Sequence, residues 1–249
     1  MIKLGNLILN GTPRIAVGMK DHADSQILID AKNKGLDIVE IRIDQFSNLD
    51  KKYVLSEIAK FKKFPTIATI RSKKEGGNWR LSEEKRLELF KSIIPKVDAV
   101  DVELSSKEIL PKIVNFAHKH KKIVVISYHN FDRTPLTADL TKILDSARAI
   151  GADIVKIAVM ALKRKDVQAL ARFTLSNSDK NIITISMGAE GIVSRVLFPA
   201  LGSLVTYAYV GESTAPGQLP YSNTFDMLRM LYQNYNEEKI TALKLLQNI

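Results

Sequence analysis

Eight short apolar runs, spaced at near-regular intervals, constrain the fold of this 249-residue chain most strongly. Each run is rich in Val, Ile and Ala, successive runs begin 23 to 33 residues apart, and amphipathic stretches fill the gaps. This pattern predicts strands that are covered on both faces and alternate with helices. The runs are Arg14–Met19, Ile38–Asp44, Thr66–Arg71, Ala99–Leu104, Val124–His129, Ile154–Val159, Asn181–Met187 and Leu204–Tyr209.

Eight strand–helix units in about this length indicate an α/β fold, a (β/α)8 TIM barrel in a single domain over residues 1–249. A short hairpin in the first dozen residues is expected to close one end. The alternative is a doubly wound open sheet. Against that fold, no Gly-x-Gly-x-x-Gly follows the first run, and no Gly-rich Lys-Ser/Thr phosphate loop occurs. No linker or composition break suggests a second domain.

Helix boundaries can be predicted at several places. A helix over Asp24–Lys34 is expected to end at Gly35, and another over Ala138–Ile150 at Gly151, because glycine favours the left-handed C′ position. Ser82 precedes two glutamates and is expected to cap a third helix. A terminal amphipathic helix is expected over Glu237–Asn248.

Composition and charge exclude several classes of function. The chain has no cysteine, so disulfides, thiolate metal sites and cysteine nucleophiles are excluded, and its four histidines form no convincing metal cluster. We therefore expect no metal and no cofactor. The net charge is +10, but the lysines are scattered over helical stretches without interleaved aromatics. This indicates a solvated surface, or attraction of a small anionic substrate, and no nucleic-acid partner.

The N-terminal residues contain only a short apolar run, Leu7-Ile8-Leu9. This run is too short for a signal peptide or a transmembrane span. The sequence therefore predicts a cytoplasmic location and no membrane association.

Lys156 is an ionisable residue inside the apolar sixth run, and two interpretations are open for it. In the first, its stem lies along the outer face with its ammonium in water. Alternatively it points inward, where burial is expected to lower its pKa and make it an amine nucleophile that forms Schiff bases with carbonyls. The run alone does not decide between these interpretations.

Other strand ends favour the inward orientation, because chemistry in a barrel lies at the carboxyl ends of its strands. Charged residues alternate with apolar ones in the second and fourth runs, so their charges share one face, which we expect to point into the barrel. Together these ends offer an amine, an imidazole acid/base and guanidiniums suited to a carboxylate. The residues concerned are Glu40, Arg42, Asp44, Arg71, Glu75, Asp101, Glu103, His129, Lys156 and Arg195. Arg42 and Arg71 are expected to lower the pKa of Lys156 further.

The order and spacing of these residues resemble the type I 3-dehydroquinate dehydratase family over nearly the whole chain. The resemblance rests on Glu40-Ile-Arg42-Ile-Asp44, Arg71-Ser-x-x-Glu75-Gly-Gly, Ser127-Tyr-His129-Asn-Phe, Lys156-Ile-Ala, Ile185-Ser-Met187-Gly, Ser194-Arg195 and Ala215-Pro216-Gly217-Gln218.

The resemblance implies dehydration of 3-dehydroquinate to 3-dehydroshikimate, a step of the shikimate pathway, by syn elimination through an imine. It implies Lys156 as the Schiff-base lysine, His129 as the general acid/base, and Glu75 as the acid that orients this histidine. Arg195 matches a carboxylate clamp. The remaining positions that match substrate contacts are Glu40, Arg42, Arg71, Thr214 and Gln218. The family is commonly dimeric, so a homodimer is expected.

Some positions depart from the family pattern or stay open. Thr214 stands where the family often has serine, and Gly18 stands where a serine often approaches the substrate. Which of Asp44, Asp101 and Glu103 faces Lys156 cannot be assigned. The loop from Gly211 to Tyr221 is expected to act as a lid, with glycines that flex and prolines that restrict it.

Two rival functions are weighed against the dehydratase. A class I aldolase would also use a Schiff-base lysine on a barrel strand, but such barrels usually carry a phosphate site after the last two strands, where this chain has Arg195 and the lid sequence. A basic binding protein without catalysis is the second rival, motivated by the net charge of +10.

Overall fold

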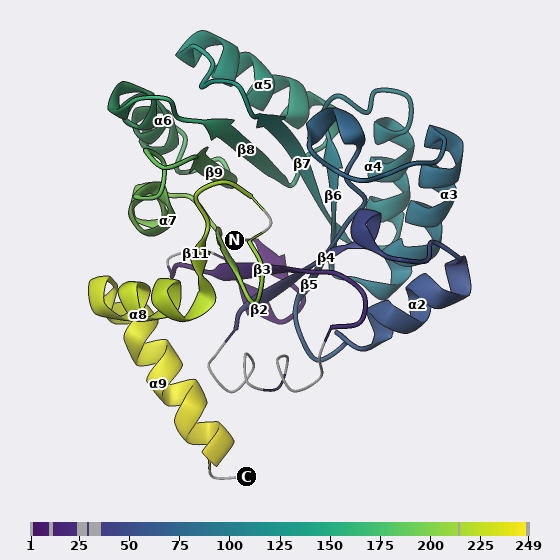
Figure 1. Ribbon diagram of the computed structural model, residues 1–249, viewed down its shortest axis with the longest axis horizontal. Helices are drawn as coiled ribbons and strands as arrows, with labels where there is room; N and C mark the ends of the chain where they lie inside the picture. The colour runs from purple at the N-terminus through teal and green to yellow at the C-terminus, as the bar shows by residue number, and fades with distance from the viewer. Residues whose placement is uncertain (1, 10–11, 24–28, 30–35, 214, 248–249) are drawn as a thin grey trace.

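The computed structural model describes residues 2–9, 12–23, 29, 36–213 and 215–247. A ring of parallel strands is surrounded by helices (Figure 1). The eight predicted strands are confirmed, with ends that differ by a few residues. They are β3 (Ile15–Met19), β4 (Ile38–Arg42), β5 (Thr66–Thr69), β6 (Ala99–Glu103), β7 (Ile123–Asn130), β8 (Ile154–Met160), β9 (Ile182–Met187) and β10 (Thr206–Tyr209).

Strand order follows the chain from β3 to β9, and β10 pairs with β3, which returns the sheet to its start. The remaining seam, between β9 and β10, is closed by an isolated parallel bridge from Ile182 to Ser203. A doubly wound sheet would reverse its strand order in the middle. The barrel prediction is therefore confirmed, and the open-sheet alternative is wrong.

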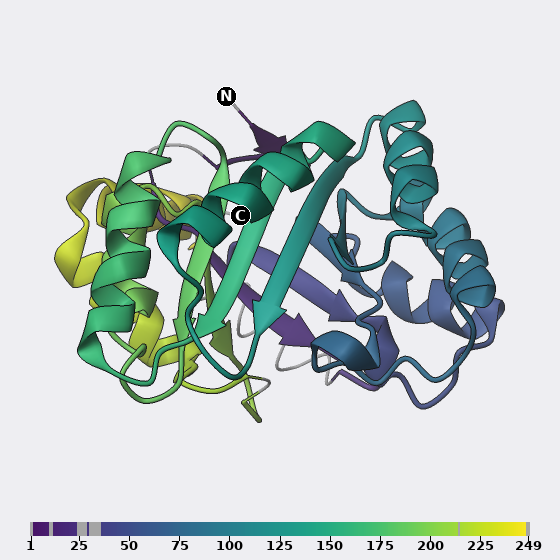
Figure 2. The ribbon, with the colours of Figure 1, turned by 90° about the horizontal axis from the view of Figure 1, so that it is seen from above.

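Helices and short 3-10 turns link the strands and cover the outside of the barrel (Figures 1 and 2). The α-helices are α2 (Lys51–Ala59), α3 (Glu83–Ile93), α4 (Leu110–Lys119), α5 (Thr137–Ile150), α6 (Arg164–Ser176), α7 (Ser194–Leu197), α8 (Tyr221–Leu231) and α9 (Gln233–Gln247). The turns are η1 (Ile43–Gln45), η2 (Lys73–Glu75), η3 (Ile94–Lys96) and η4 (Phe198–Leu201).

The predicted helix signals act as expected where the structure describes them. Ser82 Oγ accepts a hydrogen bond from the Lys85 amide at the start of α3, and Gly151 ends α5 with a φ of +108°. The predicted terminal helix is confirmed as α9. The helix expected over Asp24–Lys34 falls almost wholly outside the described residues.

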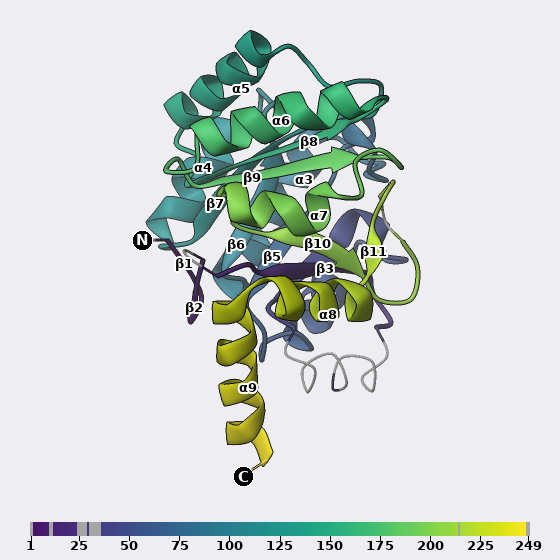
Figure 3. The same cartoon turned by 90° about the vertical axis from the view of Figure 1, so that its left-hand side faces the viewer.

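The predicted N-terminal hairpin is also confirmed. Strands β1 (Lys3–Leu4) and β2 (Leu7–Ile8) pair antiparallel at the end of the barrel where the strands begin (Figure 3). Leu4 and Leu9 are buried there and pack with residues of the barrel interior such as Ala16 and Ile38. Apolar packing thus fills this end of the barrel and leaves the opposite end for charged side chains.

Helix α9 is held at the same end of the barrel by one buried and one partly exposed ion pair. Arg14 Nη1 lies 2.5 Å from Glu238 Oε1, and Lys239 Nζ lies 2.5 Å from Asp37 Oδ1. Asp37 also accepts a hydrogen bond from the Ile15 amide at 2.9 Å. Over the described part of the chain, no helix is both long and apolar enough to cross a bilayer.

Candidate active site

Alternation along β4 and β6 directs charged side chains into the barrel, as predicted. The charged residues of both strands are buried: Glu40 and Arg42 on β4, and Asp101 and Glu103 on β6. Ile41, which lies between Glu40 and Arg42 in the sequence, packs instead in the core between the strands and the helices. Thr69 Oγ1 donates to Glu40 Oε1 at 2.6 Å, so this carboxylate is held from the neighbouring strand β5.

Lys156 on β8 points inward and is about 96% buried, so the interpretation of a surface lysine is wrong. Its Nζ donates to Asp101 Oδ2 at 3.1 Å and lies 3.7 Å from Glu40 Oε1. The amine also sits 4.1 Å from the centroid of the Tyr207 ring. Asp101 is therefore the acid that faces Lys156, a point that the sequence left open.

The expected lowering of the Lys156 pKa is also wrong for the empty site. Burial does disfavour the ammonium, and Arg71 adds to that effect, but the carboxylates of Asp101 and Glu40 outweigh both and raise the pKa above its usual value. The amine is therefore protonated at neutral pH until a ligand or a base changes its surroundings.

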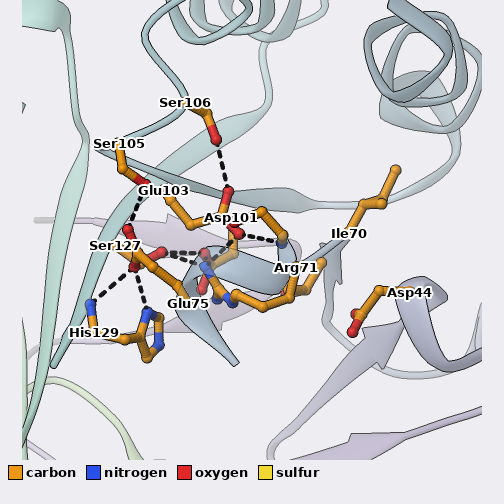
Figure 4. Close-up of polar contacts among 12 residues, drawn as sticks. Asp44, Ile70, Arg71, Glu75, Asp101, Glu103, Ser105, Ser106, Ser127 and His129 are labelled. Carbon is orange, nitrogen blue, oxygen red and sulfur yellow. Dashed lines mark hydrogen bonds and ion pairs between the residues drawn. The ribbon is translucent and has the colours of Figure 1, made fainter. Parts of the chain in front are cut away.

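A row of alternating charges runs from Lys156 to the helical layer. Figure 4 shows its middle part, from Asp101 through Arg71 to Glu103. Asp101 accepts from Lys156 and, at 2.8 Å, from Arg71 Nη2; Arg71 Nη1 lies 3.2 Å from Glu103 Oε1. Glu103 is also paired with Arg86 of α3, a fully buried side chain. Each inner carboxylate thus bridges two cations, which offsets the cost of burying these charges.

Ser127 on β7 completes the hydrogen bonding around this row. Its hydroxyl donates to Asp101 Oδ1 at 2.6 Å and accepts from Arg71 Nη1 at 2.7 Å. Burial opposes ionisation of Asp101, but Arg71 and Lys156 outweigh it and hold the pKa of this carboxyl far below its usual range. Asp101 therefore remains an anion at any physiological pH.

His129, at the end of β7, pairs with Glu75 of η2 (Figure 4). Glu75 Oε2 lies 3.0 Å from His129 Nδ1 and accepts from the His129 amide at 2.9 Å, while Glu75 Oε1 accepts from Ser105 Oγ at 2.5 Å. Burial, followed by the charges of Arg71 and Lys156, moves the pKa of His129 well below its usual value. The imidazole is therefore neutral at pH 7.

Glu75 has the opposite shift. Burial raises its pKa to about 7, although the hydrogen bond from Ser105 and the charge of Arg71 act against that rise. Glu75 therefore titrates near neutrality beside a histidine that stays neutral. When ionised, this carboxylate can hold the proton of the imidazole on Nδ1, which leaves Nε2 free as a base.

Two arginines approach the mouth of the site in different states. Arg42 is engaged by Asp44, with Nε 3.0 Å from Oδ1 and Nη2 2.9 Å from Oδ2. Arg195 is about 98% buried, has no acidic partner among the described residues, and donates from Nη2 to the Pro216 carbonyl at 3.2 Å. Its Nε has no partner in the described structure. Burial alone lowers the pKa of Arg195 to about 10, so the guanidinium is still charged at pH 7.

The predicted lid covers this arginine. Ala215 and Gln218 line the pocket, and Gln218 Oε1 accepts from the Ala215 amide at 3.2 Å. Gly217 has a φ of +71°, and a Cβ there would lie 2.5 Å from the Gly188 carbonyl oxygen. Thr214, the expected hydroxyl contact, lies outside the described residues.

These groups surround one pocket at the carboxyl ends of the strands, with an empty volume of about 530 Å³ that includes its open mouth. Every described residue among the predicted site residues lines it: Glu40, Arg42, Arg71, Glu75, His129, Lys156, Arg195 and Gln218. The sequence did not single out Tyr207 or Phe131, which also line it. Gly18 is not among the lining residues, so the doubtful serine position gains no support.

The comparisons with known proteins agree with this geometry. A family model described as type I 3-dehydroquinase matches residues 15–235. The 3-dehydroquinate dehydratase of Thermodesulfovibrio yellowstonii is 34% identical over 226 residues, which cover 90% of this chain and 98% of the relative. The corresponding protein of Methanococcoides burtonii is 37% identical over 235 residues, which cover 93% of this chain and 100% of the relative.

Solved structures give the same result. The type I 3-dehydroquinate dehydratase of Clostridium difficile, with covalently modified comenic acid, superposes with a TM-score of 0.83 at 32% identity, covering 94% of this chain and 98% of the relative. The 3-dehydroquinate dehydratase of Geobacillus kaustophilus gives 0.85 at 31% identity, covering 94% and 96%. The chain belongs to the type I 3-dehydroquinase family.

Proposed function

We propose that this protein dehydrates 3-dehydroquinate to 3-dehydroshikimate through an imine on Lys156, in the shikimate pathway. The observation that supports this most strongly is one buried amine that shares a pocket with a neutral imidazole and a buried arginine for which the described residues supply no acidic partner. A ketone on a small anionic ring needs these three groups: a nucleophile, an acid/base and an anion clamp.

Imine formation requires the Lys156 ammonium to lose a proton first. His129 is neutral and is the proposed acceptor of that proton. The free amine attacks the C3 carbonyl, and the carbinolamine loses its oxygen as water with a proton returned from His129. The product is an iminium whose positive charge acidifies the neighbouring C2–H bond.

Elimination follows from the same pair of residues. Nε2 of His129 takes the C2 proton, the resulting enamine expels the C1 hydroxyl, and the imidazolium gives that proton to the leaving oxygen, so water departs. Hydrolysis of the conjugated iminium then consumes one water and frees Lys156. Glu75, 3.0 Å from Nδ1, orients the ring for both transfers.

The other residues position the substrate. Arg195, with Nε unpaired in the described structure, is the proposed clamp for the ring carboxylate. Glu40, Arg42, Arg71, Gln218 and, from the family resemblance, Thr214 are proposed to hold the hydroxyls and the carboxylate. Covalent attachment together with these contacts would supply proximity and orientation.

Borohydride reduction in the presence of 3-dehydroquinate tests the mechanism directly. The expected result is a mass increase on Lys156 alone, located by peptide mapping, and its loss in Lys156→Ala. His129→Ala should still form some trapped imine while turnover, followed by the enone absorbance, falls at least about a hundredfold. Label on another lysine would contradict the mechanism, and aldol cleavage of sugar phosphates without enone formation would favour the aldolase.

A homodimer, supported by the family resemblance, and a cytoplasmic location, consistent with a biosynthetic enzyme of this family, also stay proposals. Analytical ultracentrifugation of the purified chain tests the first. A sedimenting species at the monomer mass of 27.9 kDa across micromolar concentrations would contradict the dimer.

A further inference from the structure

Tyr207 contacts the reactive amine but has no part in the mechanism above. It lies on β10, between Thr206 and Ala208, and is about 96% buried at the wall of the pocket. Its ring face receives the Lys156 ammonium, with Nζ 4.1 Å from the ring centroid. Lys156 lies on β8 and Tyr207 on β10, and β9 stands between these two strands in the chain. Their side chains therefore meet inside the barrel and not along one pair of neighbouring strands.

The ring completes a three-sided cradle around the amine. Asp101 and Glu40 approach Nζ at 3.1 and 3.7 Å, and the aromatic face closes a further side. A cation over an aromatic face is stabilised by the ring quadrupole, more strongly where water is excluded. Unlike the carboxylates, the ring cannot accept the lysine proton, so it restrains the amine without competing for that proton.

The phenol hydroxyl is a separate observation. It is buried and has no hydrogen-bond partner at acceptable geometry within the described structure. Burial raises the phenol pKa, and the nearby ammonium only partly offsets this, so the hydroxyl stays a neutral donor. A phenylalanine would supply the same ring without an unsatisfied polar atom, which carries a cost when buried. The hydroxyl, which is acted on by the Lys156 ammonium but accepts no hydrogen bond of good geometry in the described structure, keeps its own proton available to donate to a ligand in the pocket.

We propose that Tyr207 is a positioning residue with two separable parts, a ring that holds the Lys156 amine towards the pocket and a hydroxyl that hydrogen-bonds a polar substituent of the bound ketone next to the carbon under attack. This inference rests on the proposed imine mechanism. The substituent of the appropriate chemistry is a ring hydroxyl, which can accept from a phenol.

Two substitutions separate the parts. Tyr207→Phe keeps the ring, so borohydride trapping of 3-dehydroquinate should proceed within about twofold of the unmodified rate and with the same pH dependence. Loss of the hydrogen bond should raise KM about three- to tenfold, with a smaller change in kcat. Tyr207→Leu removes the aromatic face and should slow trapping at least about tenfold, a defect that the phenylalanine variant does not share.

Tyr235→Phe is the matched control. Tyr235 is also fully buried, but its hydroxyl lies 3.5 Å from Asp37 at the opposite end of the barrel. The Tyr235→Phe substitution should change the melting temperature and leave KM and borohydride trapping unchanged. If the leucine variant does not fold, Tyr207→Met replaces it, because an unbranched side chain adapts to the cavity.

The outcomes are distinguishable. An unchanged KM in Tyr207→Phe overturns the role of the hydroxyl, and equal trapping by the leucine and phenylalanine variants overturns the role of the ring. If the unmodified protein yields no adduct on Lys156, the proposed function fails before Tyr207 is tested. If the unmodified protein forms the adduct normally and the Tyr207 variants change neither KM nor trapping, this inference alone is overturned.

Discussion

At the scale of single residues, the site depends on titratable groups whose surroundings move their pKa values apart. Burial raises the pKa of Glu75 to about 7 and lowers that of His129 well below its usual value, although the two side chains are 3.0 Å apart. Such opposed shifts are typical of acid/base sites. They make Glu75 the group that titrates near neutrality, with consequences for both stability and activity.

Glu75→Gln tests this group. The unfolded chain loses the Glu75 proton near pH 4.5, but the folded chain keeps it until about pH 7. The stability of the unmodified protein therefore falls, because of this residue, as pH rises from about 4.5 to 7. The glutamine variant lacks this loss, so its free energy of unfolding relative to the unmodified protein should rise over that window and level off above pH 7.

Turnover should change in the opposite direction. Without a carboxylate on Nδ1, His129 is no longer held as an Nε2 base, so kcat should fall about ten- to a hundredfold at pH 8. Urea unfolding and the enone assay, each run from pH 5 to 8.5, measure the two effects. A difference in unfolding free energy that does not vary with pH would contradict the raised pKa of Glu75.

Asp101→Asn tests why the Lys156 pKa is raised. Removing this carboxylate takes away the largest favourable charge on the ammonium, so the pH midpoint of imine trapping should move towards acid by about one unit or more. Asp44→Asn is the control, because Asp44 binds Arg42 and does not contact Lys156. A midpoint that stays in place, or moves towards alkaline pH, would contradict this account.

The sequence predicted most of this site, because alternation in β4 and β6 and the position of His129 at a strand end fix which side chains enter the barrel. It did not predict the direction of the Lys156 pKa shift. That direction depends on which charges lie nearest the amine, and hence on how the strands are staggered around the ring, which periodicity does not give. Tyr207 was missed for the same reason, since an inward tyrosine in a short strand carries no sequence signal.

At the scale of elements, the strands were predicted to within a few residues at their ends, and the lid role of the loop from Gly211 to Tyr221 stays a prediction. The Pro216 carbonyl accepts from Arg195 and, at 3.4 Å, from the Gly188 amide, so the lid is closed over the pocket in this structure. The close approach of this loop to Gly188 depends on Gly217, because a larger residue would place a Cβ against the Gly188 backbone. The short strand β11 (Leu219–Pro220), which lies near the end of this loop and pairs with β10, was not predicted because two residues carry no periodicity.

Gly217→Ala should keep the lid from closing. The new Cβ would lie 2.5 Å from the Gly188 carbonyl oxygen at a φ of +71°. We expect KM to rise about tenfold or more, because the lid residues no longer reach the substrate. Gly211→Ala is the matched control, since its φ is +78° but a Cβ there meets nothing within 4 Å. Equal effects of the two substitutions on KM would show that backbone strain alone is responsible.

At the scale of the whole molecule, function and stability lie at opposite ends of the barrel. The end that carries the pocket is lined by charged side chains, whereas the other end is closed by the N-terminal hairpin and by the ion pairs that fasten α9. Asp37 is central to that fastening, because it binds the Ile15 amide as well as Lys239.

Asp37→Asn should therefore affect stability and leave catalysis intact. It removes the carboxylate that lies 2.5 Å from Lys239 Nζ in a buried setting, a loss that typically costs about 3–5 kcal/mol in free energy of unfolding. Asp139→Asn, which removes an exposed ion pair to Lys142, should cost less than about 0.5 kcal/mol. Urea titration measures both, and kcat per folded molecule should be unchanged. A large fall in kcat for Asp37→Asn would contradict the separation of the two ends.

The pairing of β10 with β3 sets the order in which the molecule can be assembled during synthesis. Ile15 on β3 pairs with Thr206 on β10, so the ring cannot close until residue 206 has been synthesised. Pairings this distant in sequence form late. Lys156, Glu75 and His129 leave the ribosome well before Arg195 and the lid, by several seconds at about 5–20 residues per second. A chain that ends before residue 206 therefore lacks β10 and with it Tyr207, the aromatic face against which Lys156 lies in the closed ring.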